Sequence, residues 1–284
     1  MGAAIAARLI EAGHSLTVWN RSAEKAKPLL DAGATFAKTP KELASRVDAV
    51  ITILTDPAAI DSVYHGSDGL LAGDVTGKLF IEMSTVRPEV QTALAAKVRA
   101  KNASYVECPV GGTTGPARQG KLFGFMGAEP ADAERARPIL EQLCRRLEHV
   151  GAVGNGALVK FAINLPLMVY YQALGESLAL SRSVGLAPER IMDMLADSSG
   201  GPNMMKLRAP TVAKMLKGED AGAVTFDVVG CLKDLQSMRD EGRARGVELP
   251  IVEQTLACFE EAVSHGLGEK EAASLSVYWS KKGA

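Results

Sequence analysis

The sequence predicts an α/β domain with a doubly wound parallel sheet, followed by an all-α C-terminal domain. In the first half, short apolar runs such as the one at 49–54 alternate with helical patterns, which is typical of a parallel sheet covered on both faces. From Ala157 onward the sequence contains no convincing strand. A glycine-rich stretch at 151–156 separates the two halves. We therefore expect one domain at 1–153 and a second at 154–284.

Each element of the first domain follows from a local signal. Helical periodicity, with Gly13 ending the first helix and Pro88 beginning the third, predicts helices at 3–12, 23–31, 88–101 and 130–145. Continuous apolar or β-branched runs predict strands at 15–19, 49–54, 79–82, 105–106, 122–126 and 147–150. Because helices separate most of these strands, the strands are expected to lie parallel.

The second domain is expected to contain one long helix at 156–184. Its centre, 161–175, carries no charge, but this run is shorter than the roughly 20 residues of a membrane span. Pro166 should bend the helix or remove one of its hydrogen bonds. A helix that is apolar all round usually has partners on every side. Shorter helices are expected to begin near residues 187, 203, 226, 251 and 270.

Composition narrows the class of protein. The chain has 284 residues, 23% of them charged, and a formal net charge of -1, which is ordinary for a globular protein. This balance gives no electrostatic reason to expect nucleic acid or an anionic membrane as a partner. No cysteine pair has CxxC spacing, so buried free thiols in a reducing, cytoplasmic setting are expected. The cysteines are Cys108, Cys144, Cys231 and Cys258.

The chain opens on a helix, whereas a Rossmann-like dinucleotide domain opens on a strand and a G-x-G-x-x-G turn. Gly2 stands where the third glycine of that turn would be. The ribose-reading site is expected about 20 residues further on, which coincides with Asn20-Arg21-Ser22. This spacing suggests that about ten residues, with the first strand and two glycines, are missing, and such a chain would bind cofactor poorly. The alternative is a domain that simply begins with a helix.

Asn20, Arg21 and Ser22 bear on the choice of dinucleotide. An acidic residue at this place would hydrogen-bond the ribose of NAD and repel the 2′-phosphate of NADP. Here a cation and two hydrogen-bonding side chains stand instead, and arginine pairs well with phosphate. The sequence therefore favours NADP, with NAD possible. The alternative is an exposed turn in which Ser22 caps the helix that begins at Ala23, and Ser22 could serve both purposes.

Lys160 and Asn164 lie one turn apart in the predicted long helix. Lys160 has apolar neighbours on both sides, and an ammonium group is costly to bury unless it is paired or used. Burial would lower the pKa of Lys160, which suits a general acid or base, and its charge could stabilise a developing oxyanion. Asn164 could hold a substrate oxygen or Lys160 itself. The alternative is a surface lysine whose stem covers apolar neighbours.

Five motifs occur in order along the chain. They are Met1-Gly2, Ser84-Thr85-Val86-Arg87-Pro88, Pro109-Val110-Gly111-Gly112, the segment from Gly156 to Asn164, and Phe226 with Lys233-Asp234-Leu235. They resemble, in that order, the GLGxMG turn, the S-T-x-x-P turn, the substrate loop, the G-x-x-x-K-x-x-x-N helix and the F…K-D-L segment of one family. That family is the β-hydroxyacid dehydrogenases, which include 3-hydroxyisobutyrate dehydrogenases and glyoxylate/succinic semialdehyde reductases.

The resemblance implies an NAD(P)-dependent enzyme that transfers hydride between nicotinamide and a small β-hydroxyacid or its semialdehyde. It implies Lys160 and Asn164 as the catalytic pair, with Lys160 as general acid/base, and it implies no metal. The family's habit of assembly implies a homodimer or homotetramer. The cofactor site implied by the resemblance and by the spacing above comprises Met1, Gly2, Asn20, Arg21, Ser22, Thr55, Thr85, Phe226 and Lys233.

The expected substrate is small and bears a carboxylate. Backbone N–H groups around Gly111 and Gly112 could bind that carboxylate, because glycine allows close approach. Thr113, Lys160 and Asn164 complete the expected substrate site. The family often reads P-V-S-G-G here. In this sequence Gly111 replaces the serine and Thr113 the second glycine, so the serine contact to the carboxylate is lost or taken over by a threonine.

Two other functions are kept as alternatives. The first is imine reduction on a similar scaffold, which Lys160 and the glycine loop disfavour because imine substrates bring no carboxylate. The second is a catalytically silent module that binds a ligand or another protein. The unusual front end favours the silent module, and the pair of Lys160 and Asn164 disfavours it.

Overall fold

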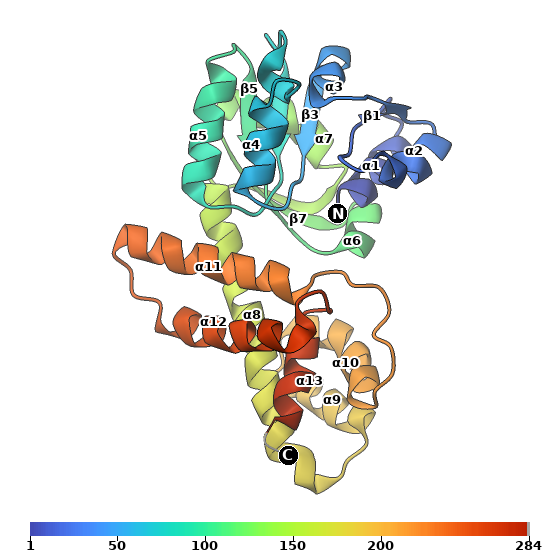
Figure 1. Ribbon diagram of the computed structural model, residues 1–284, viewed down its shortest axis with the longest axis vertical. Helices are drawn as coiled ribbons and strands as arrows, with labels where there is room; N and C mark the ends of the chain where they lie inside the picture. The colour runs from blue at the N-terminus through green and yellow to red at the C-terminus, as the bar shows by residue number, and fades with distance from the viewer. Residues whose placement is uncertain (283–284) are drawn as a thin grey trace. The chain divides into compact units, whose positions relative to one another are not determined.

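The computed structural model describes residues 1–282 and divides into two compact units, with the division between Ala162 and Ile163. All of the strands belong to the first unit. The described part of the second unit is helical, apart from one isolated bridge between Asp227 and Glu271. An α/β domain followed by an all-α domain, as predicted, is confirmed (Figure 1).

The main sheet of the first unit has the order β3-β4-β5-β7-β6, with β8 paired to β7. Its strands are β3 (Ala49–Thr52), β4 (Leu79–Glu82), β5 (Ser104–Glu107), β6 (Val110–Gly111), β7 (Leu122–Ala128) and β8 (Cys144–His149). The predicted parallel arrangement is confirmed for β3, β4 and β5, whereas β7 runs antiparallel to both β5 and β6. The chain therefore turns back after β6, and we did not predict this reversal.

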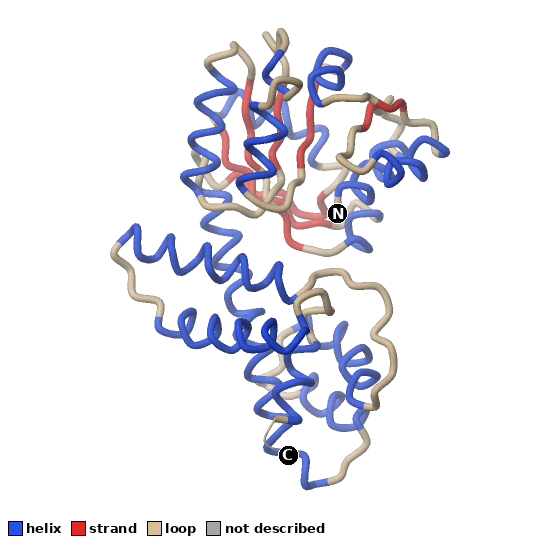
Figure 2. The backbone as a smooth tube through the Cα atoms, viewed as in Figure 1, coloured by secondary structure: helices blue, strands red, loops and turns tan. Residues whose placement is uncertain are grey.

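A second, two-stranded sheet pairs β1 (Thr17–Val18) with β2 (Thr35–Phe36) in parallel. Among the described residues it shares no ladder with the main sheet, and Figure 2 shows the two short strands apart from it. Helices flank the strands of both sheets. They are α1 (Gly2–Glu11), α2 (Lys27–Asp31), α3 (Pro40–Arg46), α4 (Pro57–His65), α5 (Pro88–Arg99), α6 (Thr114–Arg118) and α7 (Pro130–Leu140), with 3₁₀ turns at Ala23–Ala26 and Leu70–Ala72.

Strand β4 shows why the sheet carries helices on both faces. Successive side chains of a strand point to opposite faces, and every residue of β4 is buried. Ile81 belongs to the core cluster that contains Ile5 of α1 and Leu140 of α7. Its neighbour Phe80 belongs to a different cluster, which contains Leu94 of α5. The continuous apolar run of β4 thus reflects burial against two helix layers.

Several predicted boundaries differ in the first unit, most clearly at the helix after β7. The helix expected at 130–145 ends at Leu140, and Cys144 already begins β8, because pairing with β7 overrides the local helical preference of this segment. Helices α3 and α4 were not predicted, although both carry start signals. Thr39 accepts a hydrogen bond from the N–H of Glu42 and Asp56 one from that of Ala59, and each is followed by proline.

Helix α8 (Asn155–Ser181) is the longest helix of the chain as described, and it runs through Pro166 without interruption. It begins in the first unit and continues into the second. Its buried positions recur every three or four residues, including Lys160, Asn164, Met168 and Tyr171, so they share one face. A 3₁₀ turn follows at Arg182–Val184.

The remaining helices of the second unit are α9 (Pro188–Asp197), α10 (Asn203–Leu216), α11 (Val228–Arg245), α12 (Pro250–Ala262) and α13 (Ser274–Lys281), with a π turn at Val263–Leu267. Helix α9 packs against α10, and α11 packs along α12 (Figure 1). Helices were expected to begin near 226 and 270 but begin at Val228 and Ser274, because the segments before them form the backbone bridge between Asp227 and Glu271.

The segment Asn155–Val184 is long and apolar enough to cross a membrane by length and composition alone. This segment is longer than the uncharged run at 161–175, which is too short for a membrane span. In its most apolar window 44% of the residues are buried inside the structure. A core helix passes the same test, so this property is weak evidence for a membrane span.

Candidate active site

The carboxyl ends of β3 and β4 are joined by a buried hydrogen-bond network. The N–H of Leu54, after β3, donates to Oγ of Ser84, after β4, over 2.7 Å. The N–H of Ser84 donates to Oε1 of Glu82 over 2.7 Å, and Oγ1 of Thr52 donates to its Oε2 over 2.5 Å. Ligands of open α/β sheets bind outside this edge. The network therefore fixes the loop that carries Thr85, which is half-buried.

Glu82 and Glu107 pair in register on β4 and β5, and both carboxyl groups are buried. Burial raises the pKa of Glu82, although its hydrogen bonds with Ser84 and Thr52 act in the opposite direction. Burial raises the pKa of Glu107 to about 7, while backbone amides of Gly154, Ala157 and Gly156 act to lower it. Neither residue was a predicted site residue, because an acid at a strand end has no distinctive sequence signal.

The start of α1 lies against the segment after β3. A Cβ at Gly2 would lie 3.2 Å from Cγ2 of Ile53, so glycine allows this close approach. The carbonyl oxygen of Met1 accepts the N–H groups of Ala4 and Ile5, so the first-turn amides that a ligand could bind are those of Gly2 and Ala3. Thr55, two residues after Ile53, is exposed and donates to Oδ2 of Asp56 over 2.7 Å. Thr55 and Gly2 thus lie near the same edge.

Asn20, Arg21 and Ser22 follow β1 of the smaller sheet. Oδ1 of Asn20 accepts the N–H of Ser22 over 2.9 Å, and Arg21 is exposed. Ser22 precedes the 3₁₀ turn at Ala23–Ala26 but makes no side-chain cap there. Ser22 is thus the N-cap residue of an element that begins at Ala23, as the alternative expected, but its side chain makes no cap hydrogen bond, and Asn20 accepts the N–H of Ser22.

The substrate loop follows β5 and includes β6. At Gly111 a Cβ would meet nothing closer than 3.7 Å, so the position has room for a side chain. At Gly112 φ is +121° and a Cβ would lie 2.9 Å from Cδ2 of Leu122, so only glycine fits. Thr113 is half-buried, and its carbonyl oxygen accepts the N–H of Ala117 at the start of α6.

Lys160 and Asn164 lie four residues apart on α8 and are 8% and 7% exposed. The interpretation of Lys160 as a surface lysine is therefore wrong. Nδ2 of Asn164 donates to Oδ2 of Asp234 on α11 over 3.1 Å. Asp234 is 3% exposed, and its Oδ1 lies 3.0 Å from Nζ of Lys233. Phe226 is half-buried just before α11. Asp234 was not predicted as a site residue, although it belongs to the K-D-L motif.

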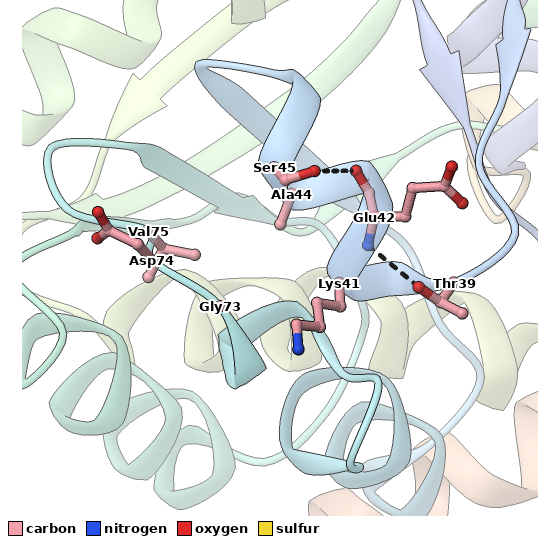
Figure 3. Close-up of a pocket in the computed structure, with 8 residues that line it drawn as sticks. All are labelled: Thr39, Lys41, Glu42, Ala44, Ser45, Gly73, Asp74 and Val75. Carbon is pink, nitrogen blue, oxygen red and sulfur yellow. Dashed lines mark hydrogen bonds between the residues drawn. The ribbon is translucent and has the colours of Figure 1, made fainter.

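The surface hollow drawn in Figure 3 lies elsewhere. It measures about 270 Å³ and is lined by α3 and the segment before β4 (Figure 3). None of the predicted site residues lines it, and it holds no pair of groups suited to proton or hydride chemistry. Its lining residues are Thr39, Lys41, Glu42, Ala44, Ser45, Gly73, Asp74 and Val75.

Two family models cover almost the whole chain. Residues 1–151 match the NAD binding domain of 6-phosphogluconate dehydrogenase. Residues 154–278 match the NAD-binding domain of NADP-dependent 3-hydroxyisobutyrate dehydrogenase. The chain belongs to the β-hydroxyacid dehydrogenase family. The predicted resemblance is thus confirmed at the level of the family, and this β-hydroxyacid dehydrogenase homologue is an NAD(P)-binding oxidoreductase.

Two curated proteins that are similar to this chain are named as a reductase and a dehydrogenase. The chain is 29% identical to glyoxylate/succinic semialdehyde reductase 1 of Arabidopsis thaliana, over 97% of this chain and 93% of that protein. It is 33% identical to 3-hydroxyisobutyrate dehydrogenase of Pseudomonas aeruginosa, over 74% of this chain and 70% of that protein. A solved structure of Psf3 in complex with NADP+ and 2-OPP has a TM-score of 0.86 at 24% identity, covering 98% and 96% of the two chains.

The residues of this family member fit a dinucleotide at the carboxyl edge of β3 and β4. The amide groups and the dipole at the start of α1 attract phosphate, and Gly2 brings this helix start close to the segment after β3. Thr55 and Thr85 border the same edge. Arg21 provides an exposed cation after β1, where no carboxylate interrupts Asn20-Arg21-Ser22. These residues would hold the cofactor.

Proposed function

We propose that this protein transfers hydride between NADP and a small β-hydroxyacid or its semialdehyde. The observation that carries the proposal is the burial of Lys160 and Asn164 on one face of α8, with Asn164 held by Asp234. Buried lysine and asparagine side chains are unusual in a helix whose buried positions are mostly apolar, with Gln172 as the other buried polar residue. Two such groups four residues apart suit the handling of one substrate oxygen.

Lys160 acts as the general acid/base. In the oxidative direction its neutral amine takes the hydroxyl proton as the carbinol carbon loses hydride, and in reduction its ammonium returns that proton to the carbonyl oxygen. NADP supplies or accepts the hydride when bound. Asn164 holds the same oxygen through its amide, and the hydrogen bond to Asp234 fixes the amide's orientation. The ammonium of Lys160 also stabilises negative charge on the oxygen.

The substrate carboxylate binds to the loop at 111–113. Gly112 adopts a left-handed conformation that turns backbone N–H groups towards a ligand, and Thr113 adds a hydroxyl group. Arg21 would pair with the 2′-phosphate of NADP, with Asn20 and Ser22 beside it. The family resemblance adds Phe226 and Lys233 to the residues that would contact the cofactor. The assembly is a homodimer or homotetramer in the cytoplasm.

The test is reduction of glyoxylate, succinic semialdehyde and the semialdehyde of 3-hydroxyisobutyrate, followed by NADPH absorbance. Lys160→Ala should lower kcat by about 100-fold or more while the Kd for NADPH, measured by fluorescence titration, changes little. Lys97→Ala, at an exposed lysine of α5, is the matched control and should behave as the parent chain. Turnover that survives in Lys160→Ala would remove the catalytic assignment. Imine reduction without carbonyl reduction would replace the substrate class.

A further inference from the structure

Helix α8 begins without a side-chain cap of its own. The N–H of Leu158 donates to the carbonyl oxygen of Gly154 over 3.3 Å, so Gly154 closes the first turn. A serine, threonine or aspartate at such a position normally accepts the free amides of that turn. Gly154 has φ of +101° and no side chain to do so. The acceptor must therefore come from another part of the fold.

Glu107, the last residue of β5, provides this acceptor. Its Oε1 accepts the N–H of Ala157, fifty residues further along the chain, over 3.2 Å. The carboxyl group is 0% exposed. A carboxylate at the amino end of a helix interacts favourably with the helix dipole as well as with the amide. Glu107 thus caps α8 across the fold.

Two glycines leave space for this carboxyl group. A Cβ at Gly156 of α8 would lie 2.6 Å from Oε1 of Glu107 and 2.4 Å from the carbonyl oxygen of Phe125 on β7. A Cβ at Gly127 of β7 would lie 2.5 Å from the same Oε1. Any side chain at either position would displace the carboxyl group or the helix. The fold is therefore shaped around Glu107.

The carboxyl group is costly to keep at this place. Its second oxygen, Oε2, has no hydrogen-bond partner among the described residues, and Glu82 lies beside it in register. An apolar side chain of similar shape would avoid both costs. A buried polar group with such a cost is best explained by a task, and the backbone amides that act on Glu107 belong to the start of α8 and to Gly154 directly before it.

Lys160 follows Gly156 by four residues and Ala157 by three, so it lies on the face of α8 that Glu107 holds. We propose that Glu107 is a positioning residue, which holds the first turn of α8 against β5 and β7 and thereby sets the place from which Lys160 reaches the substrate. This inference rests on the proposed catalytic function of Lys160. All of its residues belong to the first unit.

Titration of Glu107 should be visible in the pH dependence of kcat. Because the pKa of Glu107 is raised to about 7, its charge changes within the range in which the enzyme can be assayed. The titratable groups that interact with it are Glu82 on β4, Tyr105 on β5 and Cys108 directly after β5. Tyr105 and Cys108 have strongly raised pKa values and stay neutral there. A limb of the kcat profile near pH 7 is expected to belong to Glu107.

The experiment compares Glu107→Leu and Glu107→Gln by steady-state kinetics and by hydrogen exchange of the peptide at 154–162. Glu107→Leu removes the acceptor, so exchange in this peptide should accelerate and kcat should fall about 10- to 100-fold, with KM for NADPH unchanged. Glu107→Gln keeps an acceptor oxygen and should retain most of kcat at pH 6, but lose the limb near pH 7. Glu82→Gln is the matched control for exchange, because Glu82 binds Thr52 and Ser84 instead of α8.

Three results would overturn the inference. The first is unchanged exchange at 154–162 in Glu107→Leu. The second is faster exchange in Glu107→Leu without any fall in kcat, provided that the separate variant Lys160→Ala is inactive. The third is a pH 7 limb that persists in Glu107→Gln. Failure of the proposed function is separate, because it appears as full turnover in Lys160→Ala whatever the exchange rates are.

Discussion

Asn164 of α8 and Asp234 of α11 are joined by a 3.1 Å hydrogen bond from Nδ2 to Oδ2, and both side chains are buried. Asp234 also lies 3.0 Å from the ammonium group of Lys233. One carboxylate therefore orders two residues that the sequence assigns to the substrate and the cofactor. Because Asp234 contacts both Asn164 and Lys233, its loss should affect substrate binding and cofactor binding together.

Replacement of Asp234 by alanine should damage stability and turnover together. Removing a buried acceptor takes away the hydrogen bond from Asn164 to Asp234, which should cost about 1–3 kcal/mol in the free energy of unfolding, measured in urea. Because this bond orients the amide of Asn164, kcat should fall about tenfold or more. Asp240→Ala is the matched control, since Asp240 lies on the same helix with a side chain that is 42% exposed and pairs only with Arg239 in the structure as described. Equal effects at both positions would contradict the role of Asp234.

The substrate loop permits a paired test at adjacent glycines. Gly111→Ser should fold normally, because a Cβ there meets nothing closer than 3.7 Å. The new hydroxyl group should lower KM for carboxylate-bearing substrates about three- to tenfold, which corresponds to the net contribution of one typical hydrogen bond, roughly 0.5–1.5 kcal/mol. Gly112→Ser places a side chain at φ of +121°, 2.9 Å from Leu122, and should lower the free energy of unfolding by about 1–3 kcal/mol. A KM that rises in Gly111→Ser would place the carboxylate elsewhere.

Elements whose signal lies in neighbouring residues were predicted from the sequence, whereas elements that depend on pairing with a distant strand were not. The strand predicted at 79–82 has the bounds of β4, because Leu79, Phe80 and Ile81 form a continuous apolar run. The helix starts at Pro88 and Pro130 were also located correctly, whereas those at Pro40 and Pro57 were missed. Cys144–His149 was misread in part, because its residues favour a helix locally and only the neighbouring β7 makes them a strand.

The candidate site shows the same limit. Lys160 and Asn164 were identifiable because charge and amide interrupt an apolar helix at helical spacing. Glu107 was not, because a glutamate that ends a short strand is usually solvated. Its burial follows from two glycines, Gly127 and Gly156, that approach it from distant parts of the chain. A single sequence does not reveal that these three residues meet.

The preference for NADP can be tested at Arg21. Arg21→Ala removes the exposed cation after β1, so KM for NADPH should rise about three- to tenfold while KM for NADH stays nearly unchanged. The increase should shrink at high salt, because screening weakens an exposed ion pair. Arg145→Ala, at an exposed arginine of β8, is the matched control. Equal losses for both cofactors in Arg21→Ala would mean that this residue does not read the 2′-phosphate.

Stability should depend on pH in a direction set by Glu107. Its pKa is about 7 in the folded chain and 4.5 in the reference state, so the folded protein binds this proton more tightly than the unfolded chain does. The resulting stabilisation is complete below about pH 4.5 and is lost as pH rises through about 7, a difference on the order of 3 kcal/mol. Burial shifts the pKa of Glu82 in the same direction, so both acids favour folding at the lower pH. Urea unfolding of Glu107→Gln between pH 5 and pH 8 should show a smaller fall in the free energy of unfolding than the parent chain. Parallel curves for the two proteins would mean that Glu107 does not titrate in this range.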